Sequence, residues 1–322
     1  MKALVLQSIG SYPIIQDIDT PTLSDENQAL VQVSHCGLNR RDFYITQGLY
    51  PGIELPAVLG SDVCGFYEGK PVVVNPNINW GDNEAFQSPN YTILGMPSKG
   101  GLAELVKVGK DRIYPKPEHL SMEEASILPL GGLTAFRALF TKGQFAKGQK
   151  VFINGIGGGV ASLAFSMAKA ISQEVYVSSG SDEKIQAAIK LGAKGGVNYK
   201  KENWHKELQA MSGGVDVIID SAGGDGFAYF PRFCRPGARI VSYGGTRGKI
   251  NGLSPQHLNW KQISILTSTM GSDREFEQML HYVNEHEVRP ILDTVYTMET
   301  LSSGLDRLKN SSQLGKISIK ID

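Results

Sequence analysis

The stretch best suited to bind a charged ligand is the glycine-rich turn at residues 155–159. An apolar run, Val151-Phe152-Ile153, stops at this turn, and the chain then restarts as an apolar helix, from Leu163 through Ala168. A strand, tight turn and helix start of this kind places free N–H groups and the positive end of the helix dipole beside a pyrophosphate. The spacing Gly155-x-x-Gly158-x-x-Ala161 is a relative of the dinucleotide fingerprint, not its strict form. The expected contacts with a dinucleotide are therefore Gly155, Gly157, Gly158, Gly159 and Val160.

The next expected strand ends in hydroxyl groups where a carboxylate is usual. In a dinucleotide fold an acidic residue closes this strand, about 20 residues after the glycines, and binds the ribose 2′-OH. Here Ser179 closes it, and the two acids that follow fall in the first turn of a helix that Ser181 is expected to cap. Ser179, Lys184 and Tyr199 offer donors and positive charge that suit a 2′-phosphate. We therefore expect NADP(H) rather than NAD(H); the alternative is that Lys184 is only a solvated helix residue.

The sequence around these residues falls into two regions with different patterns of expected secondary structure. Residues 1 to about 118 consist of strands and loops, including a long, irregular, turn-rich stretch from Asn75 to Gly101. A capping box, Ser121-x-x-Glu124, then opens a helix, and strands alternate with helices beyond it. This alternation predicts an α/β, doubly wound parallel sheet. The expected strands after Val151 are Val175–Val177, Val197–Tyr199, Val215–Asp220, Arg239–Tyr243 and Ser264–Thr267, followed by an amphipathic helix at Asp273–Glu285 and a final strand at Lys316–Ile321 that pairs back with the N-terminal region.

Length, charge and cysteine content narrow the class of protein. A chain of 322 residues predicts two domains, and 32 Lys+Arg against 32 Asp+Glu leaves no global basic field for nucleic acid or anionic lipid. No apolar stretch approaches transmembrane length, and the N-terminal run is too short for a signal peptide. Cys36, Cys64 and Cys234 form no CxxC pair, which is typical of a reducing cytoplasm. We expect a cytoplasmic protein.

The order of a β-rich domain, a nucleotide domain and a short return segment resembles the medium-chain dehydrogenase/reductase superfamily over nearly the whole chain. The resemblance implies a GroES-like catalytic domain at 1–118, a Rossmann NADP(H)-binding domain at 119–269, and a return segment at 270–322 that completes the catalytic domain. It also implies that Thr134, Gly244 and Thr246 line the cofactor cleft, with Met270 and Gly271 near the nicotinamide. The stretches that carry the resemblance are residues 36–42, 55–62, 128–135, the glycine turn, 215–220, Pro236-Gly237 and Tyr243-Gly244.

The alcohol dehydrogenases of this superfamily hold a catalytic zinc by Cys, His and Cys at three of these stretches. The matching positions here are Asn39, Ser61 with Asp62, and Leu130. Zinc requires thiolate, imidazole or carboxylate ligands, and this set cannot supply three of them. The stretch from Asn75 to Gly101, where the resemblance places the structural-zinc lobe, contains no cysteine. We therefore expect neither zinc site.

The run Asn39-x-x-Asp42-x-Tyr44, followed by residues 47–51, resembles the zinc-free, zeta-crystallin-like quinone oxidoreductase branch. The chain departs from that branch in a shortened connection at residues 65–71. Without a metal, hydrogen-bond donors must stabilise the oxygen that gains charge as the nicotinamide gives up hydride. The candidates are Tyr50, Tyr44 and Asn39, with Tyr50 first, because related enoyl reductases carry a similar tyrosine as the proposed proton donor. The alternative for each tyrosine is a half-buried aromatic, and Asp42 is expected to fix the loop.

The leading hypothesis is an NADPH-dependent reductase of small quinones or α,β-unsaturated carbonyls. An enoyl-thioester reductase, for which Arg40-Arg41 is only a slight basic hint, and a non-catalytic NADP(H)-binding protein remain as alternatives. A homodimer is expected, since an apolar edge strand such as Ser264–Thr267 is a liability unless it is covered.

Overall fold

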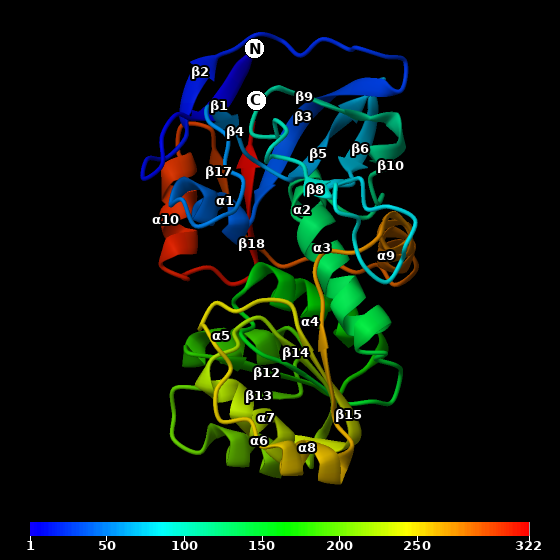
Figure 1. The fold of residues 1–322 in the computed structure, drawn as a ribbon, viewed down its shortest axis with the longest axis vertical. Coiled ribbons are helices and arrows are strands. Elements are labelled where there is room, and N and C mark those ends of the chain that lie inside the picture. Colours follow the sequence, from blue (N-terminus) through cyan, green and yellow to red (C-terminus); the bar gives the residue numbers. More distant parts are fainter. Residues whose placement is uncertain (322) are drawn as a thin grey trace. The chain divides into compact units, whose positions relative to one another are not determined.

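The computed structural model describes residues 1–321 and divides the chain into two compact units (Figure 1). The first unit combines residues 1–131 with the chain from Ser272 onward, and the second unit is Gly132–Gly271. The expected first boundary lay after residue 118, but residues 119–131 pack with the first unit. Ser126 Oγ lies 2.8 Å from Ser318 Oγ, and the N–H of Leu130 donates to Asp62, which explains why this segment stays there.

The first unit is built on β-sheets. Its largest sheet has the order β10-β6-β5-β3-β18-β17, with β9 also pairing with β3. The final strand β18 runs antiparallel to β3, with Ile317 opposite Leu38, so the expected return of the C-terminal strand is confirmed. The strands of this sheet are β3 (Gln28–Leu38), β5 (Asp62–Tyr67), β6 (Lys70–Val74), β9 (Leu105–Gly109), β10 (Ile113–Pro115), β17 (Leu292–Thr297) and β18 (Lys316–Lys320).

Smaller sheets and helices complete this unit. A three-stranded sheet has the order β2-β1-β4, and the long stretch from Asn75 to Gly101 contains only the short pair β7 and β8. These strands are β1 (Lys2–Leu6), β2 (Ile14–Asp17), β4 (Ala57–Val58), β7 (Asn77–Ile78) and β8 (Thr92–Ile93). The helices are α1 (Arg40–Thr46), α2 (Met122–Ser126), α9 (Asp273–Glu285) and α10 (Leu301–Lys309), with a 3-10 turn at Lys110–Arg112. Helix α9 has the predicted bounds, and the predicted capping box at Ser121 and Glu124 is present.

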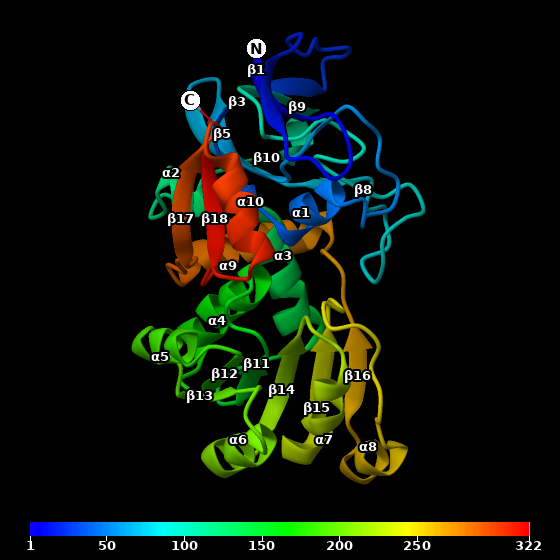
Figure 2. The same cartoon turned by 90° about the vertical axis from the view of Figure 1, so that its left-hand side faces the viewer.

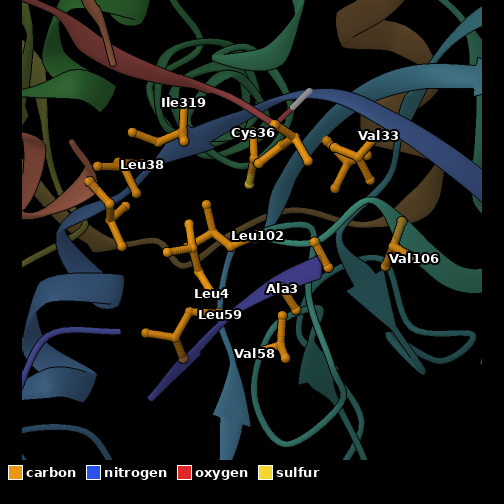
Figure 3. Packing of buried hydrophobic residues seen from close by; sticks show 14 of the residues in the cluster. Ala3, Leu4, Val33, Cys36, Leu38, Val58, Leu59, Leu102, Val106 and Ile319 are labelled. Atoms are coloured by element: carbon orange, nitrogen blue, oxygen red, sulfur yellow. The ribbon is translucent and has the colours of Figure 1, made fainter. Parts of the chain in front are cut away.

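Residues from both ends of the chain share one core in this unit. One cluster contains Leu4 of β1, Cys36 and Leu38 of β3, Ile319 of β18, and Leu102 from the segment before β9, all fully or almost fully buried (Figure 3). Because β18 supplies one side of this core, the C-terminal segment is required to complete the unit. The core supports β3, and the candidate catalytic residues follow the carboxyl end of this strand.

The second unit is a doubly wound parallel sheet, as predicted. Its strand order is β13-β12-β11-β14-β15-β16, and every neighbouring pair is parallel (Figure 2). The strands are β11 (Val151–Ile153), β12 (Val175–Ser179), β13 (Gly195–Asn198), β14 (Val215–Asp220), β15 (Cys234–Ser242) and β16 (Ser264–Thr267). Strand β15 starts five positions earlier than the sequence pattern indicates, because Cys234 pairs with Val215 before a register shift.

Helices alternate with these strands. They are α4 (Gly159–Ile171), α5 (Asp182–Lys190), α6 (Trp204–Ser212), α7 (Phe230–Phe233) and α8 (Pro255–Lys261), with a 3-10 turn at Asp225–Tyr229. Helix α3 (Pro129–Phe136) begins in the first unit and continues into the second, where Arg137–Lys142 is π-helical. No helix in residues 1–321 is long and apolar enough to cross a membrane.

Candidate active site

The expected phosphate turn joins β11 to α4 in the predicted order. Gly155 has φ +78°, a left-handed conformation that favours glycine, and Gly158 precedes the first turn of α4. The N–H of Ile156 donates to Ser178 O at 2.8 Å, which holds the turn against β12. The first N–H groups of a helix have no intrahelical acceptor. The N–H of Gly158 is used within the turn, where it donates to Gly155 O at 2.9 Å. Gly157, Gly159 and Val160 lie where free N–H groups face an anion, and this turn fits the pyrophosphate of a nicotinamide dinucleotide.

A buried polar chain fixes this turn to three strands. Asn154 Nδ2 donates to Asp220 Oδ1 at 2.6 Å, and Ser178 Oγ donates to Asn154 Oδ1 while accepting the N–H of Gly155 at 3.0 Å. Burial raises the pKa of Asp220, although Asn154 and backbone N–H groups oppose this effect. These hydrogen bonds join the ends of β11, β12 and β14. Sequence reasoning missed it, because single polar residues at strand ends give no sign of their partners.

The end of β12 carries the expected hydroxyl groups. Ser179 closes the strand, and Ser181 accepts the N–H of Lys184 at 3.3 Å, so the predicted cap of α5 is confirmed. Asp182 is engaged by Asn198 at 3.0 Å and by Lys201 at 3.1 Å, and both partners lower its pKa. The nearest acid after the strand is therefore held by its own neighbours, and the third helical residue, Lys184, follows it on α5.

Tyr199 lies beside this strand end together with an arginine that the sequence reasoning missed. The N–H of Tyr199 donates to Ser179 O at 3.1 Å, and a Cβ added to Gly180 would come within 2.9 Å of the Tyr199 hydroxyl. The Arg247 guanidinium lies over the Tyr199 ring, with Cζ 4.7 Å from its centroid. The two residues are 48 positions apart in sequence (247 − 199 = 48), so only the fold brings this positive charge to the end of β12.

The remaining expected cofactor residues follow β15 and β16 or lie on α3. Gly244 packs so closely on Ser221 that an added Cβ would lie 2.9 Å from its carbonyl oxygen, and Thr246 donates its N–H to the same oxygen at 3.3 Å. Thr134 Oγ1 lies 3.7 Å from Met270 Sδ, and Gly271 follows Met270 at the end of the unit. The second unit thus places the expected cofactor residues at the carboxyl edge of one parallel sheet, where dinucleotides bind, or beside the segment leaving β16.

In the first unit the positions expected to match zinc ligands converge on the carboxylate of Asp62. Asn39 Nδ2 donates to Asp62 Oδ2 at 2.8 Å, and the N–H of Leu130 donates to Asp62 Oδ1. Lys316, only 3% exposed, places its ammonium 2.9 Å from Asp62 Oδ2 and donates to Asn39 Oδ1 at 2.6 Å and to Leu38 O at 3.1 Å. Sequence reasoning missed Lys316, whose partners lie almost a whole chain length away.

This donor set does not fit zinc. The groups around Asp62 are N–H donors, and an ammonium within ion-pair distance of its carboxylate repels a divalent cation. No group of three or more His, Cys, Asp or Glu side chains that could hold a metal ion occurs in residues 1–321. The three cysteines are buried and free, and burial raises the pKa of Cys64 to about 12, which disfavours the thiolate that metals bind.

Asp42 fixes the loop that leads into α1, as expected. Its carboxylate accepts the N–H groups of Asn39 at 2.7 Å and Gly60 at 3.3 Å, and it is fully buried. Burial raises the pKa of Asp42, an effect that Arg41 opposes. Because both oxygens are engaged by backbone N–H groups, Asp42 is a structural acceptor in this arrangement.

The three expected catalytic side chains follow β3 within one short segment. Asn39 precedes α1 and is 7% exposed, while Tyr44 on α1 and Tyr50 after it are half-buried against the core of the first unit. Tyr50 Oη lies 3.4 Å from Arg41 Nε, and the Tyr44 ring lies 6.1 Å from that of Phe43. Asn39 and Tyr50 are thus tied to a polar network, whereas Tyr44 makes an aromatic contact.

Comparison with known proteins agrees with this architecture. Residues 25–118 match the model of the alcohol dehydrogenase GroES-like domain, and residues 159–285 match that of the zinc-binding dehydrogenase family. A zinc-type alcohol dehydrogenase-like protein YogA from Leptosphaeria maculans is 32% identical, covering 96% of this chain and 95% of its own. The quinone oxidoreductase of Mus musculus is 28% identical, covering 98% and 97%. A solved NAD-dependent alcohol dehydrogenase superimposes with a TM-score of 0.92 at 30% identity and full coverage of both chains. The chain therefore belongs to the medium-chain dehydrogenase/reductase superfamily, the oxidoreductases that use a nicotinamide cofactor.

Proposed function

We propose that this protein is an NADP(H)-dependent, zinc-independent reductase of quinones or α,β-unsaturated carbonyls. The observation that carries the proposal is the closed network of Asp62, Asn39 and Lys316, at the positions where the superfamily's alcohol dehydrogenases are expected to hold zinc. A site without a Lewis acid is suited to substrates whose reduction needs only a hydrogen-bond donor at oxygen. Quinones and activated enones are such substrates, and a mouse relative carries the name quinone oxidoreductase.

In this proposal the chain's polar groups receive the charge that develops on the substrate oxygen. The nicotinamide, when bound, supplies the hydride. Asn39 keeps one Nδ2 hydrogen outside its bond to Asp62, and its Oδ1 is held by Lys316, so its amide orientation is fixed. The hydroxyl of Tyr50 accepts a hydrogen bond from Arg41 Nε, which leaves its own proton for the substrate oxygen. Preorganised donors of this kind stabilise a developing oxyanion.

The preference for NADP(H) rests on the surroundings of Ser179. Lys184 on α5, the Tyr199 hydroxyl and the Arg247 guanidinium supply positive charge and donors there, and the neighbouring Asp182 is neutralised by Lys201. Phosphate binds such groups strongly, whereas a ribose diol prefers a carboxylate. A solved relative is an NAD-dependent alcohol dehydrogenase, and steady-state kinetics with NADPH and NADH test the preference of this chain directly.

We also propose that the protein is a homodimer formed through the edge strand β16. This strand ends the six-stranded sheet and exposes Ile265, and Trp260 of α8, just before it, is 89% exposed. A second copy that extends the sheet would cover this apolar edge.

Enoyl thioesters remain the second candidate substrates. Arg40, however, donates to Leu308 O at 2.6 Å and to Ser311 Oγ at 3.1 Å, and Arg41 is buried, so this pair offers little to a phosphorylated carrier. A protein that binds NADP(H) without turnover is the third possibility.

One assay separates these functions. NADPH oxidation is measured against neutral quinones, enals, enones and enoyl thioesters, with NADP⁺-dependent alcohol oxidation as the contrast. We expect turnover with quinones or enones that Tyr50→Phe lowers. Efficient alcohol oxidation would contradict the proposal, and tight NADPH binding without any turnover would favour the non-catalytic protein.

A further inference from the structure

Arg41 is a buried arginine whose guanidinium group uses only part of its hydrogen-bond donors. It is the second residue of α1 and only 8% exposed. Its Nε donates to the Tyr50 hydroxyl at 3.4 Å, and its Nη1 donates to Ser61 Oγ and, at 3.0 Å, to Leu94 O. These bonds use the single hydrogen of Nε and both hydrogens of Nη1. In residues 1–321 no acceptor is found for the two hydrogens of Nη2.

Arg41 forms no contact ion pair within residues 1–321, although its charge lowers the pKa of the neighbouring Asp42. No carboxylate of residues 1–321 lies within 4.0 Å of its guanidinium nitrogens. The nearby acids are committed elsewhere: Asp42 accepts the N–H groups of Asn39 and Gly60, and Asp62 pairs with Lys316. A buried cation without an anion is costly, so its presence needs a compensating partner.

Tyr50 supplies a second donor beside the unused nitrogen. Its hydroxyl accepts from Arg41 Nε, and the Arg41 Cζ lies 5.0 Å from the centre of its ring. In a guanidinium, Nε and Nη2 form one edge, so the phenolic proton and the Nη2 hydrogens border the same space. Tyr50 is only half-buried, so part of its side chain is accessible to a ligand.

We propose that Arg41 and Tyr50 form a subsite for a carboxylate carried by the substrate. The inference rests on the proposed function and narrows its substrate class to enones or quinones that bear a carboxyl group. A carboxylate matches the two donors, because one oxygen accepts from Nη2 and the other from the phenol. A phosphate dianion would call for more than the one cation that this edge provides.

The test compares NADPH-dependent reduction of 4-oxo-2-pentenoic acid, which carries a carboxylate, with that of its uncharged methyl ester. The wild type is expected to show a higher kcat/KM for the acid. Arg41→Gln is expected to lower the acid-to-ester ratio of kcat/KM by roughly 10- to 100-fold, the effect of losing a hydrogen bond to a charged group. Arg41→Lys keeps the positive charge but loses the planar guanidinium. Its acid-to-ester ratio of kcat/KM is expected to lie between those of the wild type and Arg41→Gln. Arg40→Gln is the matched control, because within residues 1–321 the side chain of Arg40 hydrogen-bonds to α10 and the turn after it and not to Tyr50. Its acid-to-ester ratio of kcat/KM is expected to stay that of the wild type.

Each outcome is decisive. If Arg41→Gln lowers kcat/KM equally for the acid and the ester, Arg41 only supports Tyr50 or the fold. This result refutes the subsite. A wild type that reduces neutral quinones or enones without preferring the acid also refutes the subsite and leaves the proposed function standing. A wild type that reduces no quinone or enone refutes the proposed function, and with it this assignment of the substrate.

Discussion

Replacing Lys316 by methionine tests the buried network around Asp62 most sharply. Methionine keeps much of the length of lysine but removes the ammonium, which here contacts Asp62 Oδ2 at 2.9 Å, Asn39 Oδ1 at 2.6 Å and Leu38 O at 3.1 Å. The Asp62 carboxylate, fully buried, would then keep only the N–H donors of Asn39 and Leu130. Removing one partner of a buried ion pair costs about 3–5 kcal/mol, so we expect a loss of that size in the free energy of unfolding.

The measurement is urea unfolding of the full chain, followed by tryptophan fluorescence. Trp80 is the only tryptophan of the first unit, so a background with Trp204→Phe and Trp260→Phe reports on that unit. Lys320→Met is the matched control, because Lys320 lies on the same strand but is exposed, and we expect a change within about 0.5 kcal/mol.

A double-mutant cycle with Asp62→Asn separates charge pairing from packing. The combined variant removes both charges, and we expect its loss to be smaller than the sum of the two single losses by at least about 1 kcal/mol. If Lys316→Met unfolds within about 1 kcal/mol of its parent, or if the two losses simply add, the network does not hold Asn39 in the way described here.

Three further predictions concern the cofactor preference, the stability of the fold at low pH and the oligomeric state. Ser179→Asp is expected to move the preference from NADPH toward NADH, and Arg247→Gln to raise the KM for NADPH by about tenfold while that for NADH stays the same, in steady-state kinetics; equal effects on both cofactors would contradict the phosphate site. Burial alone would raise the pKa of Asp293, but bonds from Arg307 and a backbone N–H lower it, so the stability it adds is present above its ordinary pKa and disappears as pH falls through the lowered value. Asp293→Asn should therefore unfold more easily than wild type by about 1–2 kcal/mol at pH 7, with the gap closing in acid, and a gap that persists below pH 3 would refute the pairing. Trp260→Glu is expected to turn a dimer into a monomer in sedimentation velocity, and a wild type that sediments as a monomer would refute the β16 interface.

The local features of this chain were readable from its sequence. The apolar run, the glycine turn and the helix after it follow from short-range rules, and so do the Ser181 cap and the bounds of α9. The alternation of strands and helices was enough to predict a doubly wound sheet, because parallel neighbours require crossover helices. The return of β18 to β3 was also expected, since its alternating pattern needed a sheet to join.

The contacts that define the candidate site were less accessible. Lys316 lies in an alternating strand and would ordinarily be placed at the surface, yet it is buried because Asp62 and Asn39 compensate its charge. Arg247 reaches Tyr199 only through the fold of the loop after β15. A polar residue in a strand whose two faces are both covered is the signal for such a network, but it becomes visible only when the neighbouring strands are known.

The central claim is that polar side chains, without a metal, carry the reduction. The most direct measurement determines NADPH oxidation with a neutral quinone and the zinc content of the same purified sample, before and after dialysis against a chelator. This account predicts turnover at zinc far below one equivalent and no loss of rate after chelation. Stoichiometric zinc, with activity that disappears on chelation and returns on adding zinc, would contradict it.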